Sequence, residues 1–484
     1  MKKINCFITY CGEKDTSRIV SFLNKENLVN EVYVISNQHL KISGAKIIIT
    51  EHPNSTECIN QIVKNTASEF SLLALQNTKF EIGQFGLERL VQIAENTGAA
   101  MVYSDYYEIK NGVKSNHPVI DYQEGSLRDD FNFGPVQFYR TEDIKDFNSD
   151  QFTFAGYYAL RLHASRNGEL MRIPEFIFTS VETDTRQSGE KQFDYVSGNA
   201  REKQIEMEKA CTAHLKQIGA FLQPAFKEVD VTKNKFSVEA SVIIPVWNRI
   251  KTLKDAVESV LSQKTKFNFN LIVVDNHSTD GTTELLSKYS EQEKLIHIIP
   301  EQKDLGIGGC WNKGLFHDKC GKFAVQLDSD DLYASENTLQ TIVDKFYEEK
   351  CAMVIGSYRM TNFDLEEIPP GIIDHKEWTD DNGPNNALRI NGLGAPRAFF
   401  TPVLRKIRVP NVSYGEDYAV GLAISREYKI GRIYIPIYLC RRWEDNSDAS
   451  LDIQKQNAHN TYKDRVRTIE LKARKKKVNS LLPQ

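Results

Sequence analysis

Two apolar runs in the second half of the chain are separated by an amphipathic stretch. The runs lie in Ala240–Arg249 (ASVIIPVWNR) and Asn270–Thr279 (NLIVVDNHST), and each ends in polar residues. Between them, Thr252–Gln263 carries its apolar residues at the spacing of one helix face. A buried strand, an amphipathic helix and a second buried strand in this order predict a parallel unit of an α/β fold.

Polar residues stand where these strands are expected to end. Ligands of open α/β sheets bind at the carboxyl ends of the strands, which would bring Pro245, Asn248 and Asp275 to one edge. Further along, Asp304–Gly314 (DLGIGGCWNKG) contains a run of glycines, which lets the backbone approach a ligand that a β-carbon would exclude. These features predict a ligand site at the strand ends.

An acidic cluster follows a third apolar run. Phe323–Asp331 (FAVQLDSDD) ends in Asp328, Ser329, Asp330 and Asp331. Carboxylates crowded at a strand end repel one another unless a cation sits among them. Such a cluster holds a divalent metal whose remaining ligands are the phosphates of a nucleotide. The alternative is a solvated acidic loop that caps a turn.

Taken in order, five segments of the second half resemble glycosyltransferase family 2, whose members have the nucleotide-sugar-binding GT-A fold. The segments are SVIIPVWNR, VVDNHSTDGT, the glycine run that ends in Asn312 and Gly314, LDSDD, and YGEDYAVGLAISR, and together they cover about Ser241 to Trp443. The resemblance implies a nucleoside diphosphate sugar as donor, bound by Pro245, Asn248, Asp275, Asn312 and Asp328.

The same resemblance implies roles for the acidic residues. Asp275 would hydrogen-bond the base or ribose, and Asp328 the ribose or a metal-bound water. Asp330 would ligate Mg²⁺ or Mn²⁺ on the diphosphate, with Asp328 beside it. Asp417 would be the general base on the acceptor hydroxyl in an inverting transfer, or else only a carboxylate stabilised at a helix start. Its neighbour Glu416 would either bind the acceptor or have a structural role.

The chain departs from the family pattern at two positions. Trp311 stands where the family often has arginine, and Leu439 stands where the QxxRW motif of processive members has glutamine. Arg441 and Arg442 are therefore the candidates for neutralising the donor phosphates. No apolar run approaches the roughly 18 residues of a membrane span, so we expect one sugar per catalytic event.

Residues between the acidic cluster and Asp417 fall where acceptor loops are expected. Trp378 is a candidate for stacking on a sugar face, and Arg397 for binding an anionic group. His375 has the features of a structural histidine more than those of a ligand. The acceptor expected from the resemblance is a carbohydrate or a lipid-linked glycan, in glycan or surface polysaccharide assembly.

The first half repeats the second without its acidic residues. Val32–Asn37 aligns with Ile272–Asn276, which places Ser36 at Asp275. Four further alignments carry the repeat: Cys58 and Asn60 with Cys310 and Asn312, Phe70 with Phe323, Leu75 to Thr78 with the acidic cluster, and Tyr157 with Asp417. We expect two tandem α/β domains of the GT-A-like (Rossmann-like) class, each a mostly parallel sheet flanked by helices.

The predicted division places an inert copy first. Residues 1–235 would form the degenerate domain, with a connecting helix near 199–222, and residues 236–484 the catalytic domain with a basic C-terminal helix. Loss of the acidic positions argues against metal-dependent transfer in the first domain. That domain would cover the second, orient an acceptor or mediate assembly. The basic helix is either solvated or in weak contact with anionic lipid.

The composition of the chain restricts its expected binding partners and its cellular compartment. The 61 basic and 65 acidic residues give a net charge of −4, which lacks the basic excess of a nucleic-acid-binding protein. The eight cysteines show no CxxC spacing, and the first residues do not resemble a signal peptide. We therefore expect free thiols and a cytoplasmic location, either in solution or at the inner face of the membrane.

Two other functions compete with glycosyl transfer. A non-catalytic carbohydrate-binding or scaffold protein would carry two inert domains, and the acidic set of the second half argues against it. A sugar nucleotidyltransferase would also join a nucleotide fold to metal carboxylates, but no phosphate-cradling GxGxxx(R/K) segment lies near the first strand of either half. Metal-dependent transfer of a single sugar is therefore the predicted function.

Overall fold

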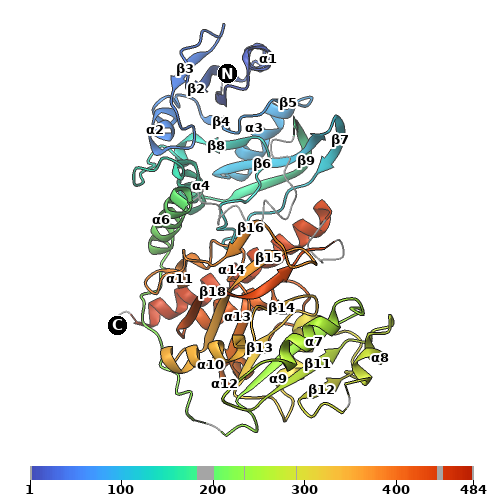
Figure 1. The fold of residues 1–484 in the computed structure, drawn as a ribbon. Coiled ribbons are helices and arrows are strands. Elements are labelled where there is room, and N and C mark those ends of the chain that lie inside the picture. Colours follow the sequence, from blue (N-terminus) through green and yellow to red (C-terminus); the bar gives the residue numbers. More distant parts are fainter. Residues whose placement is uncertain (1–2, 182–200, 234, 290, 444–450, 482–484) are drawn as a thin grey trace. The chain divides into compact units, whose positions relative to one another are not determined.

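The protein is described by a computed structural model that covers residues 3–181, 201–233, 235–289, 291–443 and 451–481. These residues form two compact units (Figure 1). The first unit contains residues 3–181, 201–221 and 451–481, and the second contains residues 222–443. The contacts therefore assign residues 222–235 to the second unit and the C-terminal helix to the first, whereas the sequence analysis assigned them the other way round.

The first unit alternates strands and helices. Its strands are β1 (Ile4–Thr9), β2 (Val29–Ser36), β3 (Lys46–Ile49), β4 (Phe70–Ala74), β5 (Phe80–Ile82), β6 (Met101–Lys110), β7 (Val113–His117), β8 (Gln137–Arg140) and β9 (Leu170–Val181). Its helices are α1 (Glu13–Leu23), α2 (Thr56–Lys64), α3 (Gly86–Thr97), the 3₁₀ turn η1 (Thr141–Asp143), α4 (Gly156–Asn167), α6 (Arg201–Gln217) and α14 (Ile453–Leu481).

The second unit repeats this alternation. Its strands are β10 (Ala240–Val246), β11 (Phe269–Asp275), β12 (Leu295–Ile298), β13 (Phe323–Gln326), β14 (Leu332–Tyr333), β15 (Met353–Thr361), β16 (Glu367–Ile373), β17 (Arg397–Phe400) and β18 (Ile430–Arg441). Its helices are α7 (Leu253–Leu261), α8 (Thr282–Ser287), α9 (Ile307–Leu315), α10 (Thr338–Glu349), α11 (Gly383–Asn386), α12 (Thr401–Ile407) and α13 (Glu416–Ser425).

Each unit is built on a nine-stranded sheet, and the two sheets have the same topology. The orders are β3-β2-β1-β4-β8-β6-β9-β5, with β7 beside β6, and β12-β11-β10-β13-β17-β15-β18-β14, with β16 beside β15. The first four strands of each order run parallel, and β8 and β17 join them antiparallel. The predicted α/β class and its duplication are therefore present, in mixed sheets.

Strand register supports the alignment of the two halves. Phe70 pairs with Ile4 at the start of β4, as Phe323 pairs with Ala240 at the start of β13. Ser36 and Asp275 each end the neighbouring parallel strand. Tyr157 and Asp417 are each the second residue of the corresponding helix. The equivalent positions follow from backbone pairing, independently of residue identity.

The apolar runs form the centre of each sheet. Every residue of β4 and every residue of β11 is buried, as expected for parallel strands covered on both faces. Burying such a strand removes its apolar surface from water, and each Å² buried stabilises the fold by about 25 cal/mol. The buried strand is therefore favoured over an exposed conformation. The strand ends, where polar residues begin, are therefore held in fixed positions by a rigid core.

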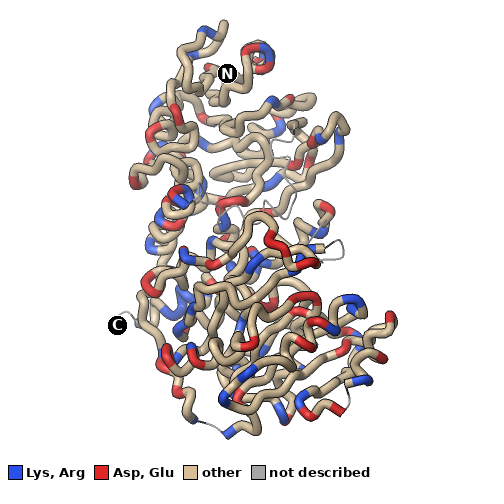
Figure 2. Tube along the Cα trace, viewed as in Figure 1, with Lys and Arg blue, Asp and Glu red and all other residues tan. Residues whose placement is uncertain are grey.

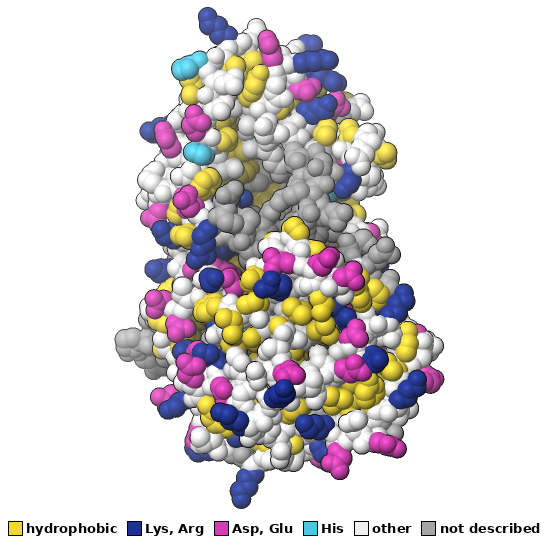
Figure 3. Space-filling model, in the orientation of Figure 1, with side chains coloured by type: hydrophobic (Ala, Val, Ile, Leu, Met, Phe, Trp, Pro, Cys, Tyr) yellow, Lys and Arg dark blue, Asp and Glu magenta, His cyan; other side chains and the backbone are white. Residues whose placement is uncertain are grey.

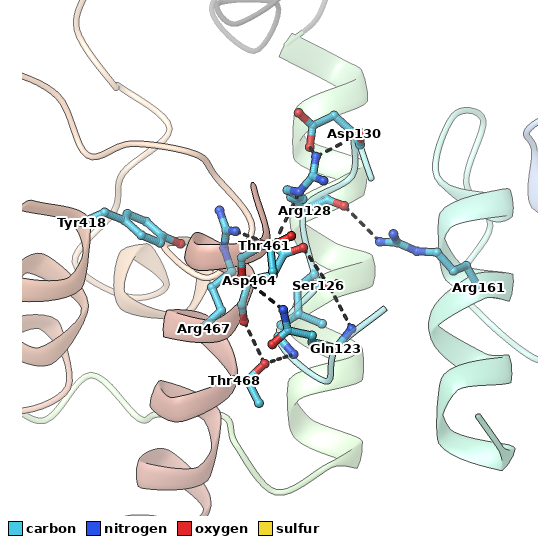
Figure 4. Close-up of polar contacts among 12 residues, drawn as sticks. Gln123, Ser126, Arg128, Asp130, Arg161, Tyr418, Thr461, Asp464, Arg467 and Thr468 are labelled. Atoms are coloured by element: carbon cyan, nitrogen blue, oxygen red, sulfur yellow. Dashed lines mark hydrogen bonds and ion pairs between the residues drawn. The ribbon is translucent and has the colours of Figure 1, made fainter. Parts of the chain in front are cut away.

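Helix α14 is anchored to the first unit by buried polar groups (Figure 4). Asp464 is fully buried, accepts a hydrogen bond from Ser126 Oγ at 2.9 Å and pairs with Arg467 at 2.8 Å. The backbone N–H of Gly125 donates to Thr468 Oγ1, and a β-carbon at Gly125 would lie 2.2 Å from the Thr468 nitrogen. The helix that appears solvated in the sequence thus buries charges by pairing them.

Charged side chains of both signs are interspersed along both units (Figure 2) and on the face drawn in Figure 3. This agrees with the balanced composition. In the part of the chain that the structure describes, no helix is long and apolar enough to cross a membrane. The eight cysteines are all free thiols, most of them buried.

Candidate active site

The acidic cluster directly follows β13 in the second unit. Burial raises the pKa of Asp328, and the neighbouring Asp330 raises it further. Burial and the same neighbours raise the pKa of Asp331 well above its ordinary value. Asp331 Oδ1 accepts the backbone N–H of Arg441 at 2.8 Å, and Asp330 Oδ2 accepts the indole N–H of Trp443 at 3.3 Å. The charge of Asp330 therefore disfavours the charged forms of both Asp328 and Asp331.

Asp275 lies at the end of β11 and is fully buried. Burial alone would raise its pKa, but His297 Nε2 at 3.5 Å from Oδ2 and hydrogen bonds from Thr283 and Ser278 more than offset this and keep the pKa below its ordinary value. Thr283 Oγ1 donates to Asp275 Oδ2 at 2.5 Å, and the Ser278 N–H donates to Oδ1 at 3.0 Å. Asp275 is therefore a charged anchor of the following turn.

The predicted donor residues on β10 lie beside this turn. Pro245 is part of β10, pairs with Val274 and is only half-buried. Asn248 has a φ of 53° in the loop after β10, and its side-chain oxygen accepts the backbone N–H of Thr279 at 2.8 Å. This hydrogen bond joins the loop after β10 to the turn after β11, and the same turn is held by Asp275.

A chain of polar contacts connects the acidic cluster to helix α13. Gln326 Nε2 donates to Asp328 Oδ1 at 2.9 Å, and Gln326 Oε1 accepts from Arg397 Nη1 at 2.8 Å. Arg397 Nη2 in turn pairs with Asp417 Oδ2 at 2.6 Å. Arg397 was predicted to bind an anionic acceptor group; in the structure it pairs with the proposed base. Asp328 and Asp417 therefore belong to one site.

Glu416 precedes Asp417 at the first position of α13. Burial raises the pKa of Glu416 to about 8, and the adjacent charge of Asp417 contributes to the increase. Its Oε2 atom is buried and has no hydrogen-bond partner in the described structure. A carboxyl group in this environment is mainly protonated at neutral pH. The candidate base at the start of the helix is therefore Asp417, whose carboxylate pairs with Arg397 and is about one-quarter exposed.

Three residues predicted to bind the donor have structural partners. Asn312 donates from Nδ2 to the carbonyl oxygen of Val409 at 2.7 Å and accepts the Val409 N–H at 3.1 Å. Arg441 is 2% exposed, and its Nη1 pairs with Asp255 at 2.9 Å. Arg442 donates its backbone N–H to the Thr361 carbonyl oxygen. Arg441 supports the acidic cluster from behind, because its Nε also donates to the Asp330 carbonyl oxygen.

The predicted acceptor-stacking residue lies in the core. Trp378 is 5% exposed, and its ring faces the guanidinium of Arg432 at 5.5 Å. A β-carbon at Gly383 would lie 2.5 Å from the indole, so the helix α11 backbone packs directly on the ring. His375 is likewise buried and pairs with Glu377 at 2.7 Å, as expected for a structural histidine. Trp378 therefore stabilises the fold and presents no face to a sugar.

The sequence analysis missed the surroundings of Trp443. Its indole contacts Asp330, and its ring lies within 5.8 Å of the Arg249 guanidinium and 5.9 Å of the Lys251 ammonium. Because Trp443 contacts Asp330, both cations lie near the acidic cluster. Both are also more exposed than Arg441. The tryptophan of the RRW segment was the available signal, because an indole N–H near carboxylates normally finds an acceptor.

The donor set fits a divalent cation that shares its coordination with phosphate. Among the described residues, no group of three or more His, Cys, Asp and Glu side chains is arranged to hold a metal by itself. Asp330 and Asp328 offer carboxylate oxygens whose mutual repulsion a cation would relieve. Mg²⁺ is commonly held by one or two carboxylates together with substrate phosphates. The cluster matches that kind of site.

The chain is similar to known glycosyltransferases. Residues 241–406 match the model of glycosyl transferase family 2. TuaG of Bacillus subtilis, a putative teichuronic acid biosynthesis glycosyltransferase, is 27% identical over 39% of this chain and 72% of its own length. An uncharacterized glycosyltransferase of Rickettsia bellii is 34% identical over 51% of this chain, but only over 36% of its own length. A solved structure of S. aureus TarS 1–349 with UDP-GlcNAc covers 49% of this chain and 72% of that chain at 20% identity, with a TM-score of 0.38.

The family match covers β11 and β17, which carry Asp275 and Arg397, and β13, which Asp328 follows. It ends before helix α13, which Arg397 and Asp417 join to the same site. The second unit therefore contains a segment, residues 241–406, that matches glycosyl transferase family 2.

Proposed function

We propose that the second unit transfers one sugar from a nucleoside diphosphate sugar to an acceptor hydroxyl, with inversion at the anomeric carbon. The observation that carries this proposal is the contact chain from Asp328 through Gln326 and Arg397 to Asp417. It connects a cluster suited to a donor diphosphate with a carboxylate suited to an acceptor. Two such groups on one site are the requirement for direct transfer.

The donor lies along the ends of β10, β11 and β13 in this proposal. Asp275 fixes the turn that contacts the base or ribose, and Asp328 and Asp330 hold Mg²⁺ or Mn²⁺. When bound, the metal supplies positive charge for the departing nucleoside diphosphate. Arg249 and Lys251 add cationic charge near the same group. The acidic cluster is therefore assigned to the donor alone.

Asp417 accepts the proton of the acceptor hydroxyl as the hydroxyl oxygen attacks the anomeric carbon. Arg397 orients the carboxylate, because its guanidinium pairs with Asp417 Oδ2 at 2.6 Å. General-base assistance of this kind is typically worth about 10² to 10⁴-fold in rate. The acceptor is a carbohydrate or lipid-linked glycan in this proposal, a class consistent with the teichuronic acid function in the name of TuaG.

The test is nucleoside diphosphate release from a panel of nucleotide sugars in Mn²⁺, with candidate glycan acceptors. Wild type, Asp330→Asn and Asp417→Asn are compared with Asp318→Asn, an exposed aspartate after α9. We expect turnover of one donor, lost in the first two variants and kept in the third. Sugar binding without turnover of any donor, unchanged in Asp330→Asn, would favour a carbohydrate-binding scaffold and refute the proposal.

A further inference from the structure

The first unit contains a cavity of about 860 Å³ at the carboxyl ends of its parallel strands. Thr9 ends β1 and Tyr10 follows it, Ser36 ends β2 and Asn37 follows it, and Gln76 lies beyond β4. Sites for small ligands commonly have volumes of about 300–1,000 Å³ and lie at this edge of an α/β sheet. The cavity therefore has the size and the location of a ligand site.

Strand register shows that this cavity is the equivalent of the candidate active site. The corresponding positions are Ser36 for Asp275, Gln137 for Arg397 and Tyr157 for Asp417. A further contact agrees: Tyr158 Oη donates to the Leu127 carbonyl oxygen, and Tyr418 Oη donates to that of Ala387, each 31 residues earlier and each at 2.5 Å. The cleft has been kept while its reactive side chains have been replaced.

The replacements remove the equivalent of the acidic cluster. Leu75, Gln76 and Asn77 occupy the segment that holds Asp328 and Asp330 in the second unit. The remaining charged residues of the lining are two acids and two bases, Glu51, Asp129, Arg161 and Lys203. The described residues of the lining therefore form no acidic cluster and have no excess of basic side chains, which are the two usual means of holding a diphosphate.

Side-chain amides have taken the place of charge. Asn37, Asn54, Gln76 and Asn77 are exposed, and Gln137 is half-buried. Each amide offers two N–H donors and a carbonyl acceptor, which matches hydroxyl groups that both donate and accept. A ligand rich in neutral hydroxyl groups is the kind of molecule that such a set recognises.

Aromatic side chains form the rest of the lining. Tyr10, Phe154 and Tyr157 are partly exposed, and Phe131 and Phe133 are buried residues of the same lining. The lining is braced by the buried Arg161, whose guanidinium lies 4.7 Å from the Tyr158 ring and 5.3 Å from the Phe133 ring. Partly exposed, rigid rings offer flat apolar area at low entropic cost. Such area suits the C–H faces of a pyranose.

We propose that the first unit binds an uncharged oligosaccharide in this cleft, without metal or nucleotide. The amides bind its hydroxyl groups, and Tyr10, Phe154 and Tyr157 pack against its ring faces. The site is a binding site and performs no transfer, because no carboxylate stands at the position of Asp417. It is independent of whether the second unit turns over a donor.

The experiment uses the full chain carrying Asp330→Asn, so that the second unit does not transfer sugar. Binding to an array of neutral and acidic oligosaccharides is measured in EDTA and then quantified by calorimetry for the best neutral ligand. We expect binding in EDTA that weakens about tenfold or more in Tyr157→Ala and in the double variant Gln76→Ala/Asn77→Ala, since each removes one or more ligand contacts. Gln92→Ala, an exposed amide on α3, is the matched control and should bind normally.

The double variant changes only exposed side chains, so it remains informative if Tyr157→Ala does not fold; circular dichroism establishes this. Three results would overturn the proposal. One is that no neutral oligosaccharide on the array binds in EDTA. Another is binding that ignores both cleft variants, which would locate the sugar elsewhere. The third is binding of UDP in EDTA that the double variant abolishes, which would make the cleft a nucleotide site.

Discussion

Replacing Glu416 by glutamine should stabilise the second unit above neutral pH. Burial raises the pKa of Glu416 from 4.5 to about 8, so the folded state binds a proton that the unfolded state has released. The contribution of Glu416 protonation to the free energy of unfolding is complete below pH 4.5. It is lost as the pH rises towards 8, at about 1.36 kcal/mol per pH unit. From pH 6.0 to 7.5 the wild type should therefore lose about 2 kcal/mol through this residue.

Glutamine resembles the protonated carboxyl and does not titrate, so Glu416→Gln should lack this loss. For a unit of this size, about 2 kcal/mol corresponds to roughly 4–8 °C in melting temperature. The measurement is thermal unfolding of both proteins at pH 6.0 and 7.5, taking the difference between the two pH effects to cancel other titrating groups. Glu301→Gln, an exposed carboxylate, should melt like the wild type at both values.

Equal pH dependence in wild type and Glu416→Gln would refute the reasoning, because it would mean that Glu416 is ionised in the folded state. It would also reopen the assignment of the base, since Asp417 was preferred on the ground that its neighbour is protonated. The variant has a second readout: it should keep turnover at pH 7, which Asp417→Asn should lose.

Three further predictions concern single side chains. Trp378→Ala should leave a cavity in the core and lower the free energy of unfolding by about 3–5 kcal/mol, without changing the KM for the acceptor. A higher KM at unchanged stability would instead show that Trp378 binds the acceptor. Trp443→Phe removes the 3.3 Å hydrogen bond to Asp330 and should raise the Mn²⁺ concentration for half-maximal activity about threefold, and an unchanged titration would show that the bond is unimportant. Asp464→Ala should destabilise the first unit by about 3–5 kcal/mol in chemical unfolding, because it leaves Arg467 buried without its carboxylate; a loss below about 1 kcal/mol would contradict the anchoring of α14.

The fold was predictable from sequence because its central strands are unbroken apolar runs. Asn270–Thr279 and Phe323–Asp331 change from apolar to acidic at the point where each strand ends, and the structure puts β11 and β13 there. Parallel strands bring such ends to one edge whatever lies between them. The same argument located Asp275 and Asp328, and the shared register of the two sheets explains why the repeat was detectable.

Long-range polar pairing was not predictable. Arg397 and Asp417 lie on different elements, and no local pattern indicates that they form an ion pair. Trp378 lies in a polar stretch, so its burial depends on the packing of α11. Helix α14 has few apolar residues, yet it buries Asp464 and Arg467 by pairing them, and its Ser126 partner is 338 residues away. Composition reports which groups are charged, and only tertiary structure reports which charges are neutralised.

This pairing explains why the reactive residues are absent as a set from the first unit. Arg397 is enclosed by Asp417, Asp328 and Glu416. Arg397 and Asp417 are partly buried, so removing the acidic partners destabilises the fold by leaving a partly desolvated cation without its neutralising charge. Total stability is only about 5–15 kcal/mol, so neutralising the acids while retaining the arginine would be unfavourable. Gln137 at the position of Arg397 avoids this cost, with Tyr157 at that of Asp417.

The converse is testable in the first unit. Tyr157→Asp alone should destabilise it, since Gln137 gives the new carboxylate no equivalent of the Arg397 ion pair. The double variant Tyr157→Asp/Gln137→Arg should recover about 1 kcal/mol or more in a double-mutant cycle of unfolding free energies. Gln92→Arg with Tyr157→Asp is the control, because Gln92 lies on the surface of α3 and should give additive effects. Additivity in the first pair would mean that the cleft no longer has the geometry of the catalytic pair, and that strand register alone does not preserve a site.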